Sequence, residues 1–303
     1  MIAKMKHTLA AGQFDRAELE LIFKQAQDME KIIEAGHSDL AKGKILATLF
    51  YEPSTRTRLS FETAMLRLGG SIISETDVNF SSITKGEVLE DTARIVGGYA
   101  DIIAIRSKTP GDAQIVADYS GVPVINGGDG AAEHPTQGLL DLYTIAKHFD
   151  LGNEPLTVSF VGELICARTV HSGSKMLRNF PNIKFNFVAP EEIQIPDDYF
   201  EEGDQKHFEL TDEILETSDV IYDTRIQKER LDPEVYEKHK TAFHFDVEKV
   251  SKMKPNALLM HPLPRVNEIA QEVDALPQAK YFEQAQNGVP IRMALIARGL
   301  GLI

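Results

Sequence analysis

The order of strand and helix signals constrains the fold of this chain more than any other feature. In its first half, four short apolar runs read as strands: residues 45–51, 71–74, 101–106 and 122–126. Each run is followed by a segment of helical periodicity, the last of which covers residues 139–148. Strands that alternate with helices are typical of a parallel sheet with helices on both faces. The sequence therefore predicts a doubly wound α/β fold.

A second alternating set follows a stretch of polar and helix-breaking residues at 149–155. It begins with an expected strand at 156–162, continues with a helix after Arg168, and adds strands near 184–188 and 219–222. The chain has 303 residues, which suits two domains of about 100–200 residues each. We expect two doubly wound parallel-sheet domains and a C-terminal helix that packs back on the first, with these limits: residues 1–150, 151–285 and 286–303.

An amphipathic helix is expected before the first strand. Asp15 followed by Glu18 is typical of a helix start, and apolar residues recur after them at helical spacing. The apolar side chains expected to face the core are Leu21, Ile22, Ala26, Met29, Ile32 and Ile33.

Composition argues against several classes of function. The net charge of −14 disfavours nucleic acid as a partner, because phosphate backbones are bound by a basic face. No stretch approaches the roughly 20 apolar residues that span a bilayer, and the N-terminal residues lack the apolar core of a signal peptide. We therefore expect a cytoplasmic protein with no membrane partner. The single cysteine, Cys166, has no partner for an internal disulfide.

Neither a metal nor a cofactor is expected from the sequence. The nine histidines and the cysteine show no metal-ligand spacing. The turn that follows Gly162 lacks the further glycines of a dinucleotide site. Nicotinamide chemistry is therefore disfavoured.

The densest group of candidate binding residues is Ser54-Thr55-Arg56-Thr57-Arg58, between the first expected strand and its helix. Backbone N–H groups and the positive end of the helix dipole favour an anion at such a junction. Three hydroxyls and two guanidiniums add donors, and the planar fork of arginine matches phosphate oxygens. Helix capping would explain one of the five residues. The motif predicts a phosphate site.

Two further junctions in the first half carry polar residues. Arg106 ends an expected strand, and ligands of parallel sheets lie beyond the carboxyl ends of strands. His134 and Gln137 open a helix after residues 127–130, a glycine-rich stretch that we expect to be a flexible loop. A surface arginine and a structural histidine are the alternatives. The hydroxyl-rich loop 79–87 is either mobile surface or a binding element.

Three arginine-bearing segments in the second half, residues 167–172, 224–230 and 261–265, are candidates to line a cleft between the domains. Surface ion pairs are the alternative for each arginine. Two prolines around Leu263 fix an irregular backbone whose carbonyls are free to accept hydrogen bonds from a ligand amide. Because no nucleophile–base pair is visible, catalysis would rest on positioning and on donors aimed at developing charge.

Five motifs, in this order, resemble those of the catalytic chains of the aspartate carbamoyltransferase family, within the aspartate/ornithine carbamoyltransferase superfamily. They lie at residues 54–58, 134–137, 168–172, 225–230 and 261–265. The first motif is shared with ornithine carbamoyltransferases. Those enzymes usually carry cysteine in place of Thr136 and a His-Cys-Leu-Pro sequence in place of residues 261–264, and this chain follows the aspartate pattern at both.

The resemblance implies transfer of a carbamoyl group from carbamoyl phosphate to L-aspartate, which yields N-carbamoyl-L-aspartate and phosphate in pyrimidine biosynthesis. The site would lie in the cleft between the domains. The residues implied to hold carbamoyl phosphate are Ser54, Thr55, Arg56, Thr57, Arg106, His134, Gln137 and the backbone carbonyls of Pro262 and Leu263. Four of these are also implied in catalysis: Arg56, Thr57, Arg106 and His134. The last three would polarise the carbonyl oxygen.

The residues implied to bind L-aspartate are Arg168, Arg225, Gln227 and Lys85. Ser81 and Lys85 match a loop that reaches the site of a neighbouring subunit, so the resemblance implies a homotrimer with shared sites. Glu52 would pair with Arg168 and Arg230 across the domains to hold the closed form. Whether a regulatory chain joins the trimer stays open.

The chain departs from the family pattern just before Arg168. The family commonly has glycine directly before this arginine, whereas this chain has Ile165-Cys166-Ala167. Alanine has less backbone freedom than glycine, which puts the position of this loop in question. Two alternative functions stay open: a carbamoyltransferase with another amino acceptor, and a non-catalytic anion-binding relative.

Overall fold

The structure, a computed structural model, describes residues 7–75, 86–130 and 133–303. The chain forms two compact units, the first of residues 1–140 with 287–303 and the second of residues 141–286. Within the described ranges no helix is both long and apolar enough to cross a membrane.

Both divisions between the units fall inside helices. These helices are α5 (Pro135–His148) and α10 (Tyr281–Gly299). The domain limits predicted at residues 150 and 285 stay predictions, and the polar stretch on which the first of them relied follows α5.

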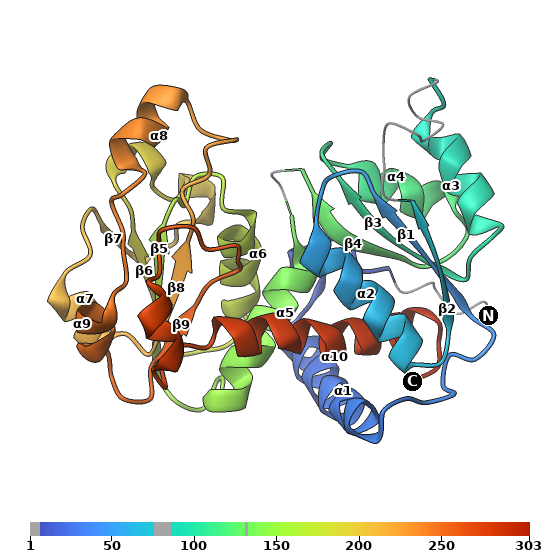
Figure 1. Cartoon of the computed structure of the whole chain (residues 1–303), viewed down its shortest axis with the longest axis horizontal. Helices are drawn as coiled ribbons and strands as arrows, with labels where there is room; N and C mark the ends of the chain where they lie inside the picture. The colour runs from blue at the N-terminus through green and yellow to red at the C-terminus, as the bar shows by residue number, and fades with distance from the viewer. Residues whose placement is uncertain (1–6, 76–85, 131–132) are drawn as a thin grey trace. The chain divides into compact units, whose positions relative to one another are not determined.

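The first unit holds a four-stranded parallel sheet with the order β2-β1-β3-β4 (Figure 1). Its strands are β1 (Ile45–Phe50), β2 (Ser71–Glu75), β3 (Ile102–Ser107) and β4 (Val124–Asp129). Its helices include the 3-10 turn η1 (Ala11–Gln13), α1 (Arg16–Ala35), α2 (Thr55–Arg67), α3 (Leu89–Gly97), α4 (Asp112–Tyr119), the first part of α5 and most of α10.

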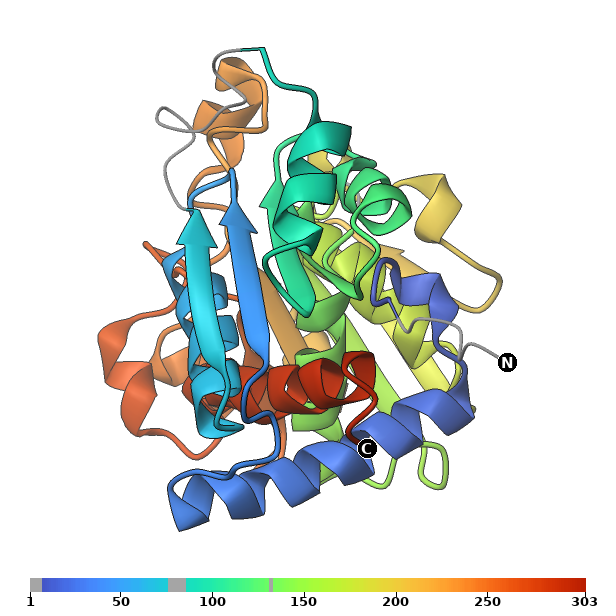
Figure 2. The same ribbon diagram turned by 90° about the vertical axis from the view of Figure 1, so that its right-hand side faces the viewer.

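Helices cover both faces of this sheet. Successive side chains of a strand point to opposite faces, so alternate residues of β1 serve different layers. Ala47 and Leu49 belong to a buried cluster with residues of α3 and α4. Helix α2 packs against β1 and β2, and Phe50 and Phe61 come together beside Gly127. Figure 2 shows the strands of this sheet with these helices around them.

Helix α1 begins as predicted, but part of its predicted core stripe is wrong. The Asp15 carboxylate accepts a hydrogen bond from the Glu18 N–H and caps the helix. The buried side chains are Leu19, Ile22, Phe23, Ala26 and Met29. Leu21 is 45% exposed, and Ile32 and Ile33 are half-buried. Leu21 lies off the stripe because a step of one residue turns the side chain about 100° around the helix.

The second unit holds a five-stranded parallel sheet with the order β7-β6-β5-β8-β9. Its strands are β5 (Leu156–Gly162), β6 (Ile183–Val188), β7 (Gln205–His207), β8 (Val220–Thr224) and β9 (Leu258–Met260). Its helices include α6 (Arg168–Leu177), α7 (Asp212–Thr217), α8 (Pro233–His239), α9 (Val247–Ser251) and the 3-10 turns η4 (Glu191–Ile193), η5 (Asp197–Tyr199) and η6 (Gln271–Ala275).

The two parallel sheets confirm the predicted fold class. One face of the second sheet supports a buried cluster that includes Val161, Ile221, Leu259 and Phe245. Strand β7 was not predicted, because its residues are polar and it lies at the edge of the sheet, where no apolar pattern is needed.

Candidate active site

The motif at residues 54–58 lies at the beginning of α2. Ser54 occupies the N-cap position, but its side chain makes no capping hydrogen bond. The backbone N–H groups of Thr55, Arg56 and Thr57 have no acceptor inside the helix, and the N–H of Arg58 is the first to bond back, to Ser54. Capping therefore does not explain the motif, and the N-terminus of α2 offers its N–H groups to a ligand.

The two arginines of the motif have different surroundings. Arg58 forms an ion pair with Glu62 at 3.3 Å, one turn further along α2. Arg56 forms no ion pair or hydrogen bond with any residue that the structure describes. The residue is exposed as a whole, yet partial burial of its guanidinium lowers its pKa from the ordinary value. A partly desolvated cation without a carboxylate partner is suited to bind an anion.

Arg106 lies at the carboxyl end of β3 and is 9% exposed. Its Nη2 pairs with the Glu52 carboxylate at 3.0 Å, and its Nη1 donates to the Gly127 carbonyl at 3.3 Å. The same Nη1 lies 3.5 Å from Nε2 of His134. The structure thus brings together Arg106, Glu52 and His134, which come from three junctions of the first sheet.

The flexible loop predicted at residues 127–130 is wrong, because Gly127 and Gly128 belong to strand β4 and are buried. The Asn126 side chain accepts the Gly128 N–H at 2.8 Å and fixes the segment. Gly128 has a φ of +130°, and a Cβ at this position would lie 2.9 Å from Nη1 of Arg106. Glycine therefore makes room for the guanidinium.

Helix α5 begins directly after His134. His134 is buried, and its carbonyl accepts the Gln137 N–H at 3.0 Å, so the two residues share one turn. Thr136 is buried and accepts from Nη2 of Arg292 in α10 at 3.3 Å. The Arg292 guanidinium also lies over the Phe61 ring, 5.0 Å from its centroid. Arg292 was not predicted, because α10 is far from these residues along the chain.

In the second unit, Glu163 organises the segment at residues 225–230. Its Oε2 accepts from Nε2 of Gln227 at 2.7 Å, and its Oε1 accepts the Cys166 N–H. Burial raises the pKa of Glu163, although these hydrogen bonds and the charges of Arg230 and Arg225 oppose the rise. Glu163 was not predicted, although it directly follows a strand, which is the signal on which the prediction of Arg106 rested.

Arg225 and Gln227 follow β8, which pairs with β5 in the centre of the second sheet. Arg225 forms a bidentate ion pair with Glu229, one contact of which is 3.2 Å long. An arginine with one neighbouring carboxylate can exchange it for a ligand carboxylate of the same geometry. The positive charge of Arg230 lies close enough to lower the pKa of Glu163, against the effect of burial.

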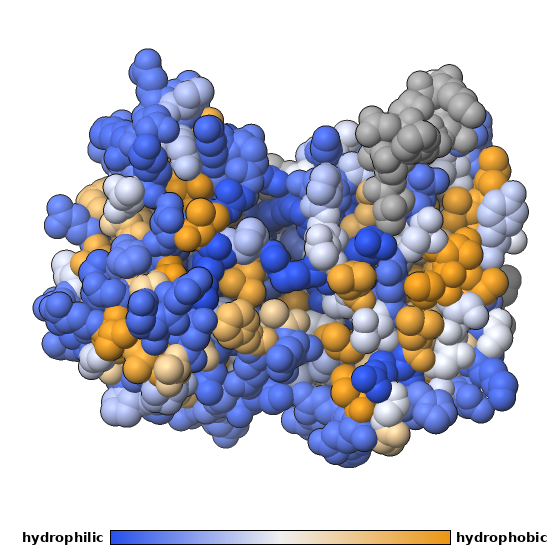
Figure 3. Space-filling model, in the orientation of Figure 1, coloured by the Kyte–Doolittle hydropathy of each residue, from blue (hydrophilic) through white to orange (hydrophobic). Residues whose placement is uncertain are grey.

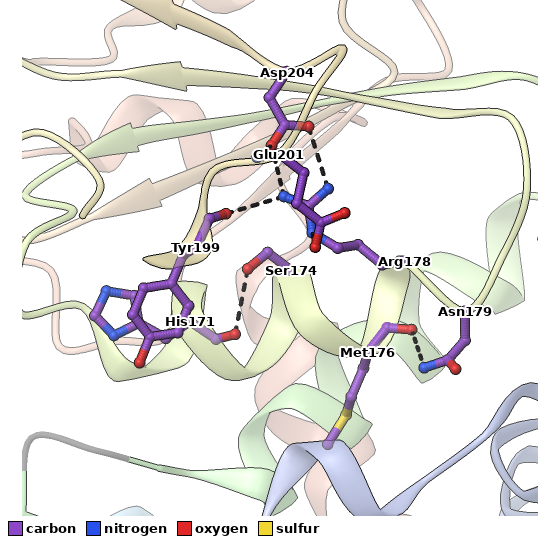
Figure 4. Close-up of polar contacts among 8 residues, drawn as sticks. All are labelled: His171, Ser174, Met176, Arg178, Asn179, Tyr199, Glu201 and Asp204. Atoms are coloured by element: carbon purple, nitrogen blue, oxygen red, sulfur yellow. Dashed lines mark hydrogen bonds and ion pairs between the residues drawn. The ribbon is translucent and has the colours of Figure 1, made fainter. Parts of the chain in front are cut away.

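Arg168 is the first residue of α6 and is 8% exposed. The helix is anchored further along, where Arg178 pairs with Asp204 at 2.6 Å and with Glu201 at 3.2 Å (Figure 4). Figure 4 also shows the His171 ring stacked on Tyr199, with their centroids 3.9 Å apart.

The turn before Arg168 is compatible with alanine. Nε2 of His171 lies 2.9 Å from the Leu164 carbonyl, which ties α6 to the start of this turn. Ala167 has a φ of −76°, which any L-residue adopts. Replacement of the common glycine by Ala167 therefore requires no left-handed backbone here.

The segment at residues 261–265 follows β9 and carries the two predicted carbonyls. Pro262 and Leu263 are half-buried, and neither carbonyl accepts a hydrogen bond from the described part of the chain. Leu263 has a φ of +56°, and the peptide bond to Pro264 is cis. The irregular backbone predicted from the prolines is confirmed.

Three predicted roles stay predictions. Ser81 and Lys85 are outside the described residues. The predicted pairing of Glu52 with Arg168 and Arg230 would join the two units and stays a prediction. Among the described residues, no group of three or more acidic, histidine or cysteine side chains could hold a metal ion.

The fold and these groups define a class of protein: a two-unit α/β protein with cationic side chains at the ends of its strands. Two domain families match the chain over almost its whole length. One, described as "Aspartate/ornithine carbamoyltransferase, carbamoyl-P binding domain", matches residues 6–147, and the other, the "Asp/Orn binding domain" of the same family, matches residues 154–298. The chain therefore belongs to the aspartate/ornithine carbamoyltransferase family.

Individual relatives agree with this membership. The aspartate carbamoyltransferase catalytic subunit of Methanococcus vannielii is 47% identical over 298 residues, which cover 97% of each chain. The crystallised catalytic subunit of aspartate transcarbamoylase from Methanocaldococcus jannaschii is 46% identical, covers 98% of each chain and superimposes with a TM-score of 0.90. Aspartate transcarbamoylase from Trypanosoma cruzi, in complex with carbamoyl aspartate and phosphate, is 38% identical, with a TM-score of 0.91 and coverage of 97% and 95%.

Proposed function

We propose that this chain transfers the carbamoyl group of carbamoyl phosphate to the amino group of L-aspartate. The products are N-carbamoyl-L-aspartate, a precursor of pyrimidines, and phosphate. The observation that carries the proposal is Arg56, a partly desolvated guanidinium without an ion pair in the described chain, at a helix start whose first N–H groups are not used by the helix. This arrangement suits a phosphate group that arrives with the substrate and leaves with the product.

The first unit would bind carbamoyl phosphate. Ser54, Thr55, Arg56 and Thr57 would hold the phosphate through backbone N–H groups, hydroxyls and the guanidinium. Arg106 would bridge the phosphate and the carbonyl oxygen, and it would exchange its ion pair with Glu52 for the substrate. Oriented donors of this kind stabilise charge that develops in the transition state.

The carbonyl under attack would be polarised by three donors: Thr57, Arg106 and His134. The proximity of the Arg106 guanidinium and the His134 ring, 3.5 Å apart, supports this role. Gln137 and the carbonyls of Pro262 and Leu263 would bind the carbamoyl NH2 group, because an amide donor needs acceptors that the protein does not use itself.

The second unit would bind L-aspartate. Arg168 and Arg225 would each take a carboxylate, and Gln227, held by Glu163, would help to orient the substrate. Two guanidiniums suit a dicarboxylate and would repel the side-chain ammonium of ornithine. This charge argument favours aspartate over ornithine as the acceptor. Lys85, outside the described residues, keeps its predicted role in binding aspartate.

We also propose a homotrimer in which Ser81 and Lys85 of one chain complete the site of its neighbour. Support comes from exposed apolar side chains on α2 and β2, namely Leu59, Leu66 and Ile73. Figure 3 shows apolar surface over this part of the first unit. Apolar side chains that are grouped on a solvent-exposed face favour contact with another chain. Light scattering on the purified protein should give three times the 33.7-kDa chain mass. The cytoplasmic location stays a prediction.

One assay tests the reaction. The protein is incubated with carbamoyl phosphate and either L-aspartate or L-ornithine, and the ureido product is measured by its colour reaction. We expect product with aspartate alone. Product with ornithine alone would make the chain a carbamoyltransferase with that acceptor, and no product with either would make it a non-catalytic relative.

A further inference from the structure

His261 is a buried histidine that the proposed reaction does not use. It is 1% exposed and directly precedes the two carbonyls proposed to bind the carbamoyl NH2 group. Two residues later, Leu263 adopts a φ of +56°. This left-handed conformation costs an ordinary L-residue about 1–2 kcal/mol, so other contacts have to stabilise it.

The His261 ring supplies one of these contacts. Its Nδ1 accepts the Leu263 N–H at 2.8 Å. A ring nitrogen that accepts is unprotonated, which leaves the ring proton of neutral histidine on Nε2. The bond closes a short turn around Pro262, in which a side chain replaces the backbone carbonyl of an ordinary turn.

This bond also determines where the Pro262 carbonyl points. The Pro262 C=O and the Leu263 N–H belong to one planar trans peptide unit and point in opposite directions. Once the N–H is bonded to His261, the carbonyl is directed away from the His261 ring. It accepts no hydrogen bond from the described residues and is available to a ligand.

The backbone on either side of this turn is fixed as well. The His261 N–H donates to Oε1 of Gln284 at 2.8 Å, and Nε2 of Gln284 donates to Asp141 at 2.7 Å. Asp141 also accepts from the Tyr222 hydroxyl at 2.8 Å, and all four residues are buried. These hydrogen bonds hold the His261 backbone N–H and the side chains of Gln284, Asp141 and Tyr222 in one arrangement.

At the other end of the segment, Arg265 is bonded to Asp274 and donates to the Tyr281 hydroxyl at 3.0 Å. The side chain of Leu263 packs against the core of the second unit. The segment is therefore attached before and after Pro262, and the His261 ring is the contact that orients the peptide between these attachments.

We infer that His261 is a positioning residue whose Nδ1 orients the Pro262–Leu263 peptide for recognition of the carbamoyl NH2 group. It does not touch the substrate in this role. The inference rests on the proposed function, because that function assigns a ligand to the two carbonyls.

Three substitutions test the inference. His261→Asn places an amide oxygen where Nδ1 lies, His261→Leu has nearly the shape of asparagine but no acceptor, and His261→Gln places its polar atoms near Nε2. We expect the KM for carbamoyl phosphate to stay within about 3-fold of wild type in H261N and to rise about 10-fold in H261L and H261Q. The kcat should change less, because the carbamoyl NH2 bonds are made in the ground state as well.

The matched shapes separate positioning from packing. An equal rise of the KM for carbamoyl phosphate in H261N and H261L, or no rise in any variant, would overturn the inference. A wild-type KM in H261Q together with a raised KM in H261N would also overturn it. Thermal unfolding checks that the variants are folded. If H261Q does not fold, the comparison of H261N with H261L decides. Wild-type protein that forms no ureido product contradicts the proposed function, and calorimetric titration with carbamoyl phosphate then gives the same comparison through affinity.

Discussion

Arg56 is the single residue on which the proposed chemistry depends most. Its guanidinium has no carboxylate partner in the described chain, so Arg56→Ala leaves no buried charge behind. We expect turnover to fall by about 10²–10³-fold, the usual loss when one donor to a developing charge is removed. Stability should change by no more than about 0.5 kcal/mol. Steady-state assays and thermal unfolding measure the two effects.

The control is Arg16→Ala, since Arg16 also lies in the first turn of a helix. Unlike Arg56, it pairs with a residue one turn away, Glu20. It should keep wild-type turnover. Equal turnover in Arg56→Ala and the wild type would contradict the assignment of the phosphate site.

Asp223 is a buried carboxyl that the proposed reaction leaves unused. It is fully buried in β8, and neither carboxylate oxygen has a hydrogen bond of ordinary geometry among the described residues. Burial, together with the negative charge of Glu268, raises the pKa of Asp223 well above its ordinary value, although a backbone contact with Thr224 and the charge of Lys249 oppose the rise. The folded state therefore binds the Asp223 proton more tightly than the unfolded state does.

This pKa shift predicts how stability depends on pH. Asp223 contributes fully to the free energy of unfolding below its unfolded pKa of about 3.9. As the pH rises from there toward the folded pKa, this contribution falls by about 1.4 kcal/mol per pH unit. Asp223→Asn removes the charged form. We expect the variant to match the wild type near pH 4 and to be increasingly more stable above it, as measured by urea unfolding from pH 4 to pH 8.

The control for Asp223→Asn is a change at Asp219, the residue that directly precedes the same strand. Asp219 is paired with Lys254 at 2.6 Å and accepts the Thr157 N–H at 2.8 Å. Asp219→Asn loses this ion pair, so it should lower the free energy of unfolding at neutral pH. Stabilisation by both substitutions, or by neither, would contradict the interpretation of Asp223.

Functional residues at strand ends were predictable from the sequence, whereas residues whose partners lie far along the chain were not. Arg106 and His134 were selected because each lies at a strand or helix junction, and the structure brings them to 3.5 Å. Asp141 and Gln284 bond each other although they are 143 positions apart. Buried polar pairs of this kind leave no periodic pattern, because each residue taken alone reads as ordinary helix surface.

Among the elements, the apolar strands were predictable and the irregular end of β4 was not. Strand β5 has the predicted limits, because a buried parallel strand is a continuous apolar run. Gly127 and Gly128 read as a loop in the sequence, yet they continue β4 beside Arg106. Glycine signals freedom of the backbone, and the sequence does not reveal that a neighbouring side chain needs the space.

This space can be tested with Gly128→Ala. The new Cβ would lie 2.9 Å from Nη1 of Arg106, and the φ of +130° is unfavourable for alanine. We expect the free energy of unfolding to fall by about 1 kcal/mol or more. Turnover should fall by up to about 100-fold because the guanidinium is displaced. Urea unfolding and the ureido assay measure the two changes.

Gly173→Ala is the matched control for this element. Gly173 lies inside α6, where a Cβ meets nothing within 4 Å and φ is ordinary. Alanine should therefore stabilise the helix by about 0.5–1 kcal/mol and leave turnover unchanged. If both glycine variants lost turnover to the same extent, contact with Arg106 would not be the cause.

At the scale of the whole molecule, the sequence predicted two α/β parts, and the limits 1–150, 151–285 and 286–303 stay predictions. The divisions fall inside α5 and α10, and continuous helices carry no linker signal that could mark them. Family membership was predictable because it depends on five short motifs in a fixed order. The roles of Ser81 and Lys85 depend on contact with a second chain. In the sequence, only the resemblance to the family indicates that contact.

Shared sites make a prediction for mixed trimers. If each site takes Arg56 from one chain and Lys85 from its neighbour, Arg56→Ala and Lys85→Ala proteins are each inactive, but every hybrid trimer contains one intact site. Dissociation and reassembly of an equal mixture should therefore restore about a quarter of wild-type activity.

The control is a mixture of Arg56→Ala with Arg106→Ala. Both of these residues serve the site from the same chain, so its hybrids contain no intact site and should stay inactive. Recovery in the control, or none in the test mixture, would show that the sites are not shared in this way.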